Sequence, residues 1–273
     1  PKFPPSQALF MLFRIYKRTG DAKALDMATK TLDEMARGGM YDHLGGGFHR
    51  YSTDEKWLVP HFEKMLYDNA LLLGAYTEGF QVTKKEEYRQ VVAGICDYLF
   101  RDLAHQGGGF YAAEDADSEH AEGKFYVWHH EELQELLTPK ELLEAKKVYQ
   151  VTPKGQFDTA KFSEIEAQAG MHGVHEANIL HLESGAPWPL KPSKELLSLR
   201  KKLWLARQKR VRPSLDDQVI TSWNGLTIAY LSKAYRVFKE PKMLSHAQQA
   251  ARFIHKELYV HGKLLRRYSK GDS

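Results

Sequence analysis

The sequence predicts an all-α protein built from repeated helical hairpins, either an open solenoid or a closed helical toroid, with a small β decoration. The main evidence is a pattern that occurs three times, with its two parts always forty residues apart. Helix-patterned apolar stretches open at residues 6–9, 68–71 and 223–226. Forty residues after the third position of each stretch comes an apolar residue close to glycine: Phe48, Phe110 and Leu265. Each unit has room for two helices and a glycine-marked loop.

The helices of these hairpins follow from apolar residues spaced three and four apart, which gives each helix a buried stripe. They are expected near residues 6–19, 22–37, 62–82, 84–104, 220–239 and 241–258. Between the second and third hairpins the repeat is interrupted. An aromatic, β-prone run at 125–128 precedes two short helices near 129–137 and 139–149. Residues 151–192 suggest a small strand pair that includes 178–182, and a basic helix is expected at 193–210.

Composition excludes several classes of protein. No apolar run approaches the ~20 residues that span a bilayer, so no membrane association is expected. The single Cys96 rules out an intramolecular disulfide framework and fits a reducing, cytoplasmic compartment. Net charge is only +4. The basic run at 200–212 lacks the interleaved aromatics that single-strand binding requires, so we interpret it as a solvated helix face and expect no nucleic-acid partner.

Four segments are too polar and aromatic to be simple connectors, and the first covers residues 41–52. Its three glycines allow a tight turn or close approach to a ligand. His49 then supplies a potential acid or base, and Arg50 a group that binds anions or hydroxyls. A glycine helix cap with a packed aromatic would explain the glycines and Phe48, but it leaves His49 and Arg50 unexplained.

The second segment covers residues 57–69, with His61 just before a helix and Asp68 inside it. A buried carboxylate needs a partner, so Asp68 is either satisfied structurally or lines a cavity. His61 and Glu63 lack the i, i+4 spacing of a helical metal pair, and no third ligand is obvious. We therefore expect no metal and no other cofactor.

The third segment, residues 111–119, places Glu114, Asp115 and Asp117 close together. It could be a solvated acidic loop, but it lacks the mid-loop glycine and terminal glutamate of an EF-hand calcium site. The functional interpretation is that one or two carboxylates point into a pocket as acid, base or hydroxyl binder.

The fourth segment, residues 212–225, combines Asp216 and Asp217 with Trp223 and Asn224. A helix N-cap would account for only one of the two carboxylates. An apolar ring face beside a side-chain amide suits a sugar. Carboxylate pairs with aromatic platforms favour carbohydrate as the ligand.

Taken together, these segments resemble the YyaL-type, thioredoxin-domain-containing (spermatogenesis-associated) protein family. The resemblance rests on Lys2-Phe3-Pro4 and on the segments 45–52, 57–69, 113–118, 123–128 and 216–226. It implies a thioredoxin-like domain followed by an (α/α)6 toroid similar to N-acylglucosamine 2-epimerases and related glycoside hydrolases. Residues 1–273 would then form a partial toroid domain, without the thioredoxin-like domain and the closing hairpins. The stretch 155–178 is longer and less regular than the family's usual connector.

The leading hypothesis is a carbohydrate-active domain, glycoside hydrolase-like or sugar epimerase-like, that acts on a sugar-like small molecule by acid–base chemistry. Asp117 and Asp217 are the expected acid and base, with His49 as an alternative base. The expected ligand-binding residues are Arg50, His61, Asp68, Glu114, Asp115, Asp216, Trp223 and Asn224. The alternative is a non-catalytic glycan- or protein-binding module that serves the thioredoxin-like redox domain of the same full-length chain. A helical scaffold repeat is a more distant possibility.

Overall fold

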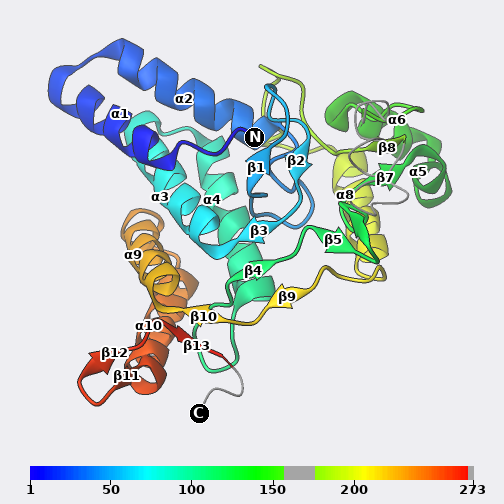
Figure 1. The fold of residues 1–273 in the computed structure, drawn as a ribbon. Coiled ribbons are helices and arrows are strands. Elements are labelled where there is room, and N and C mark those ends of the chain that lie inside the picture. The colour runs from blue at the N-terminus through cyan, green and yellow to red at the C-terminus, as the bar shows by residue number, and fades with distance from the viewer. Residues whose placement is uncertain (157–175, 270–273) are drawn as a thin grey trace.

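The computed structural model describes residues 1–156 and 176–269 (Figure 1). Three helical hairpins form its main part. They are α1 (Ser6–Thr19) with α2 (Ala22–Arg37), α3 (Leu66–Thr83) with α4 (Glu86–Tyr98), and α9 (Thr221–Phe238) with α10 (Pro241–Phe253). The first helix of each pair forms an inner row, in which α3 packs against both α1 and α9. The second helix of each pair packs against its own partner from outside.

Local chemistry sets the ends of the first hairpin. Gly20 takes a left-handed conformation at φ 73° and ends α1, and Asp21 caps α2 by accepting a hydrogen bond from the Lys23 amide. The two neighbouring inner helices and the outer helices surround α3, so its residues are buried almost all round. The core beneath is aliphatic and aromatic, and its largest fully buried side chains include Tyr76 and Tyr88.

The second and third hairpins are copies of one unit. Thr221 follows Leu66, and Pro241 follows Glu86, by the same 155 positions (221 − 66 and 241 − 86). Each outer helix also ends in a single π-helical turn, η1 (Leu99–Leu103) and η2 (Ile254–Leu258). These turns replace the last part of the α-helices that the sequence predicts at 84–104 and 241–258.

Short strands gather where the chain enters α3 and α9. The helix predicted from residue 62 begins only at Leu66, because the preceding residues pair as strands. One sheet is three-stranded and antiparallel, in the order β3 (Lys64–Met65), β4 (Ala113–Glu114), β9 (Leu215–Asp216). The two-stranded pairs are β1 (Tyr51–Ser52) with β2 (Pro60–His61), β5 (Asp117–Ser118) with β6 (Ala121–Glu122), β10 (Val219–Ile220) with β13 (Arg267–Tyr268), and β11 (Tyr259–Val260) with β12 (Lys263–Leu264).

The segment between the second and third hairpins packs around a smaller core of its own. Its helices are α5 (His130–Leu136), α6 (Pro139–Tyr149) and α8 (Lys194–Arg207), on the right of Figure 1. Of the strand residues predicted at 125–128 and 178–182, all of which the structure describes, only Trp128 and Asn178 are in strands, in β7 (Trp128–His129) and β8 (Ala177–Asn178), and these two strands pair antiparallel with each other. Most of the irregular stretch expected at 155–178 lies outside the described residues. Within the described part of the chain, no helix has the length and apolar character to cross a bilayer.

Candidate functional site

A cluster of charged side chains lies at the N-terminal end of α3, where β1, β2 and β3 bring together residues from two of the predicted segments. The Arg50 guanidinium donates a hydrogen bond to Glu63 Oε2 over 2.8 Å. The Arg50 backbone amide also donates a hydrogen bond to the Glu63 carbonyl oxygen. Pairing of β1 with β2 sets Tyr51 opposite His61, and their rings stack with centroids 4.8 Å apart. We call this region the rim.

His61 is held as a cation at the rim. Its Nδ1 lies 2.6 Å from Glu122 Oε1, and its Nε2 lies 3.6 Å from Glu63 Oε2. Burial disfavours the charge, but the two carboxylates outweigh burial and raise the pKa of His61 to about 9. His61 and Arg50 in turn lower the pKa of Glu63. At neutral pH the rim therefore carries a fixed imidazolium and an ionised glutamate.

Asp68 differs from every other carboxyl at the rim. It lies in the first turn of α3 with a side chain that is 7% exposed, and its Oδ2 atom has no hydrogen-bond partner among the described residues. Burial raises the pKa of Asp68 to about 7, although Arg50 and the Tyr67 hydroxyl both favour its ionised form. Near neutral pH this carboxyl is present both with and without its proton.

A pair of aromatic rings begins beside Asp68. Tyr67 lies next to it on α3, and its ring centroid is 4.9 Å from that of Trp223 on α9. Both residues are only partly buried. Because α3 and α9 are repeated units that enter the inner row in the same direction, their first turns meet at the same end of the molecule. The rim thus combines an apolar ring surface with carboxyl groups.

The acidic segment reaches the rim through β5 and β6. Asp117 is exposed and pairs across the strands with Glu122, which binds His61. Burial and the neighbouring Asp115 and Glu122 charges raise the pKa of Asp117, while His61 lowers it. Asp115 itself accepts hydrogen bonds from the Ala116 amide and the Ser214 hydroxyl, which fixes the turn.

Other predicted site residues lie elsewhere. His49 is 2% exposed, its Nδ1 lies 2.9 Å from the Phe62 carbonyl oxygen, and burial lowers its pKa to about 3. Glu114 is buried and bound to the Arg212 guanidinium at 2.6 Å. Asp216 accepts a hydrogen bond from a backbone amide two residues later, and Asp217 is exposed beside it.

The side-chain amide of Asn224 is hydrogen-bonded to the backbone of a loop earlier in the chain. Its amide oxygen accepts from the Phe110 amide at 2.8 Å, and its nitrogen donates to the Phe110 carbonyl oxygen at 3.0 Å. Asn69, its counterpart on α3, binds Phe48 in the same way at 2.7 and 3.0 Å. Each asparagine therefore clamps the glycine-containing loop that precedes its helix. We call these pairs the asparagine clamps.

A buried ionic cluster beneath the rim was not predicted. Asp42 binds Arg207 through two hydrogen bonds of 2.8 and 3.0 Å and binds Lys64 at 2.8 Å, and all three side chains are almost fully buried. The two cations overcome the effect of burial and hold the pKa of Asp42 well below its usual range. Arg207 thus corrects the expectation that the basic run at 200–212 is wholly solvated. It ties α8 to the loop that precedes β1.

Sequence reasoning also missed Glu63 and Tyr67 as members of the rim. The available signal was their position four residues apart in the segment 57–69, next to His61 and Asp68. In the residues that the structure describes, no three or more His, Cys, Asp or Glu side chains are grouped as metal ligands would be.

Comparison with known proteins places the chain among larger relatives. No family model matches it. It is 37% identical to human spermatogenesis-associated protein 20, over 97% of this chain and 37% of that protein. It is also 36% identical to an uncharacterized protein of Caenorhabditis elegans, over 97% of this chain and 39% of that one. The chain therefore spans well under half the length of these relatives.

Solved structures establish the fold. A family 76 glycoside hydrolase (mannosidase) of Bacteroides thetaiotaomicron superposes with a TM-score of 0.51 at 12% identity, over 93% of this chain and 43% of that one. The Lin0763 protein of Listeria innocua gives 0.50 at 14% identity, over 97% and 47%. The predicted (α/α)6 toroid class is confirmed. The chain has this toroid fold and is homologous to part of spermatogenesis-associated protein 20.

Proposed function

We propose that the rim is the reaction site of a carbohydrate-active enzyme that transfers protons through carboxyl groups, in the manner of a glycoside hydrolase or a sugar epimerase. Asp68 carries the proposal. It is a buried carboxyl with a pKa of about 7 and an oxygen that has no hydrogen-bond partner among the described residues, and it lies next to Tyr67, whose ring packs on Trp223. A pKa near the working pH suits a group that both gives and accepts a proton.

Glycoside hydrolysis needs one protonated and one ionised carboxyl group. We assign the protonated role to Asp68. Asp117, exposed on β5 and paired with the rim residue Glu122, is the candidate for the base. Arg50, whose Nε has no partner among the described residues, would donate to sugar hydroxyls, and the charges of Arg50 and His61 keep Glu63 ionised beside them.

Trp223 and Tyr67 support a sugar as the ligand, because the C–H face of a pyranose packs on aromatic rings while its hydroxyls reach polar neighbours. The mannosidase that shares the fold acts on a sugar according to its name. At 12% identity that likeness concerns the fold, so the ligand class rests on the rim residues themselves.

The test uses Asp68→Asn in the full-length protein, because the amide keeps the size of the side chain but cannot supply the proton. We expect turnover of aryl glycosides or reducing disaccharides to fall about 100-fold or more, with sugar binding retained in calorimetry. Asp26→Asn, on the exposed face of α2, is the matched control. An epimerase would in addition transfer solvent deuterium to its product. Equal turnover in the two variants would contradict the assignment.

A second candidate is a non-catalytic glycan-binding module that serves an attached thioredoxin-like domain. It is favoured by the pairing of the rim charges, since Arg50, Glu63, His61 and Glu122 largely satisfy one another. This function predicts saturable sugar binding by the wild-type protein without turnover of any sugar. It also predicts that Asp68→Asn changes neither property.

A further inference from the structure

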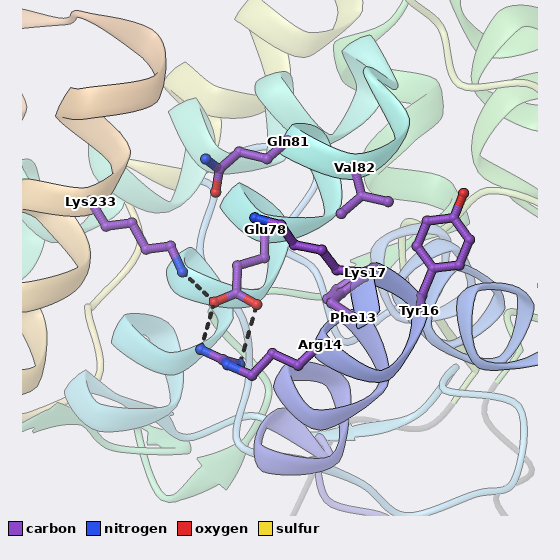
Figure 2. A pocket seen from close by; sticks show the side chains of 8 residues that line it. All are labelled: Phe13, Arg14, Tyr16, Lys17, Glu78, Gln81, Val82 and Lys233. Atoms are coloured by element: carbon purple, nitrogen blue, oxygen red, sulfur yellow. Dashed lines mark hydrogen bonds and ion pairs between the residues drawn. The ribbon is translucent and has the colours of Figure 1, made fainter. Parts of the chain in front are cut away.

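A second polar site lies toward the opposite end of the inner helices. There Glu78 of α3 is bound from both sides, by Arg14 of α1 and by Lys233 of α9 (Figure 2). The Arg14 guanidinium lies 3.2 Å from Glu78 Oε1, and the Lys233 ammonium contacts the same oxygen. Each of the three inner helices contributes one charged side chain. We call this group the inner triad.

The inner triad opens into a cavity of about 550 Å³. Besides the triad, Tyr16, Lys17 and Gln81 line it, with Phe13 and Val82 on its apolar side. A volume of this size is in the range that holds small-molecule ligands. The lining has the mixture of apolar wall and a few polar groups that such sites require.

This cavity is separate from the rim. Glu78 comes twelve residues after Leu66, the first residue of α3, which corresponds to ~18 Å along the helix axis. Between the two sites Phe10 and Tyr230 stack with ring centroids 5.5 Å apart. The stack lies over Gly74 of α3, where a methyl group would meet the Tyr230 ring at 2.3 Å. A monosaccharide at the rim could not reach the inner triad.

Charge in the cavity is unbalanced. Three cations, Arg14, Lys17 and Lys233, face one carboxylate, Glu78. Glu78 is shared by Arg14 and Lys233, and Lys17 has neither a hydrogen-bond nor an ion-pair partner among the described residues. The lining thus carries about two positive charges in excess. Gln81 adds an amide that can donate to an oxygen.

A purely structural role accounts for only part of this arrangement. Lys17 lies in the last turn of α1, where a cation interacts favourably with the helix dipole, and Glu78 ties the three inner helices together through Arg14 and Lys233. Those effects account for the presence of the three cations. They do not explain why Lys17 and Gln81 line a cavity beside the triad, or why that cavity is large enough for a ligand.

We propose that this cavity binds a compact anion, a phosphate or carboxylate group, whose charge lies among Lys17, Arg14 and Lys233. Any carbon skeleton of the ligand would pack on Phe13 and Tyr16. The Gln81 amide would donate to an anion oxygen. The ligand is distinct from the sugar at the rim, so the site does not depend on the proposed function.

The test is calorimetric titration of the full-length protein with inorganic phosphate and, separately, with citrate, at constant ionic strength. Lys17→Gln is the main variant, because Lys17 is exposed and makes no contact within the triad. We expect it to weaken binding of the preferred anion about tenfold, which is the usual effect of losing one charged hydrogen bond. The matched control is Lys30→Gln, on the exposed face of α2, and its affinity should equal that of wild type.

A second variant, Glu78→Gln, should change anion affinity in the opposite direction. It frees Arg14 and Lys233 from a competing carboxylate, so we expect anion binding to tighten several-fold even if the melting temperature falls. Asp68→Asn at the rim should leave anion affinity unchanged, which separates this site from the proposed reaction site. No saturable binding of either anion by wild type, or equal affinities for Lys17→Gln and Lys30→Gln, would overturn the proposal.

Discussion

The titration of Asp68 predicts how the stability of the protein changes with pH. The pKa of this carboxyl rises from 3.8 in the unfolded chain to about 7 in the folded protein. The folded state therefore holds a proton that the unfolded state has released, and stability falls as pH rises between these values. One pKa unit corresponds to about 1.4 kcal/mol, so the ionised carboxylate costs the folded state about 4 kcal/mol above pH 7.

Asp68→Asn removes this cost, because an amide does not ionise and still accepts the Tyr67 hydrogen bond. We expect the variant to be more stable than wild type, by a difference that grows by about 3 kcal/mol between pH 5 and pH 8. The assay is urea unfolding of both proteins at several pH values, with Asp26→Asn as the control for losing a carboxylate. A difference that is constant over this range would show that Asp68 ionises normally, and the proton-donor role would then fail with it.

Three further predictions concern residues around the inner helices. His61→Gln should cost about 1 kcal/mol of stability at pH 6 and nothing at pH 10, as measured by urea unfolding. The reason is that the folded-state pKa of His61 is about 9, so its stabilising charge is lost as the pH rises through that value. Asn224→Ala should destabilise by about 2 to 4 kcal/mol in thermal or urea unfolding, because it leaves a buried backbone amide and carbonyl unpaired. Gly74→Ala should destabilise by about 1 to 3 kcal/mol through its clash with Tyr230, whereas Gly225→Ala, with nothing within 4 Å, should stabilise by about 0.5 to 1 kcal/mol. Equal melting temperatures for these two glycine variants would contradict the packing described over α3.

The helical hairpins could be predicted from sequence because their signals are local. Apolar spacing and a left-handed glycine such as Gly20 depend on neighbours within a few residues. The two-residue strands could not be predicted in the same way. Lys64 pairs with Glu114, fifty positions away, and Ala113 pairs with Asp216, so their conformation depends on the assembled hairpins.

The same distinction separates the parts of the site. The composition of the segment 57–69 indicates a functional segment, and the position of Asp68 in an apolar helix makes it a candidate site residue. Its unpartnered oxygen and raised pKa depend on burial in the assembled fold, which the sequence does not show. Arg207 is buried because Asp42, 165 positions earlier, binds it, and no local pattern distinguishes it from its solvated neighbours.

The asparagine clamps explain why the chemistry gathers at one end of the molecule. Each clamp fixes a glycine-containing loop against the first turn of the next inner helix, Phe48 by Asn69 and Phe110 by Asn224. Arg50 comes two residues after the first clamped position. The clamp therefore sets where a loop side chain meets the helix end, while the residues after the clamp vary from unit to unit. A repeat that is structurally constant and chemically variable in this way brings unlike groups to one rim.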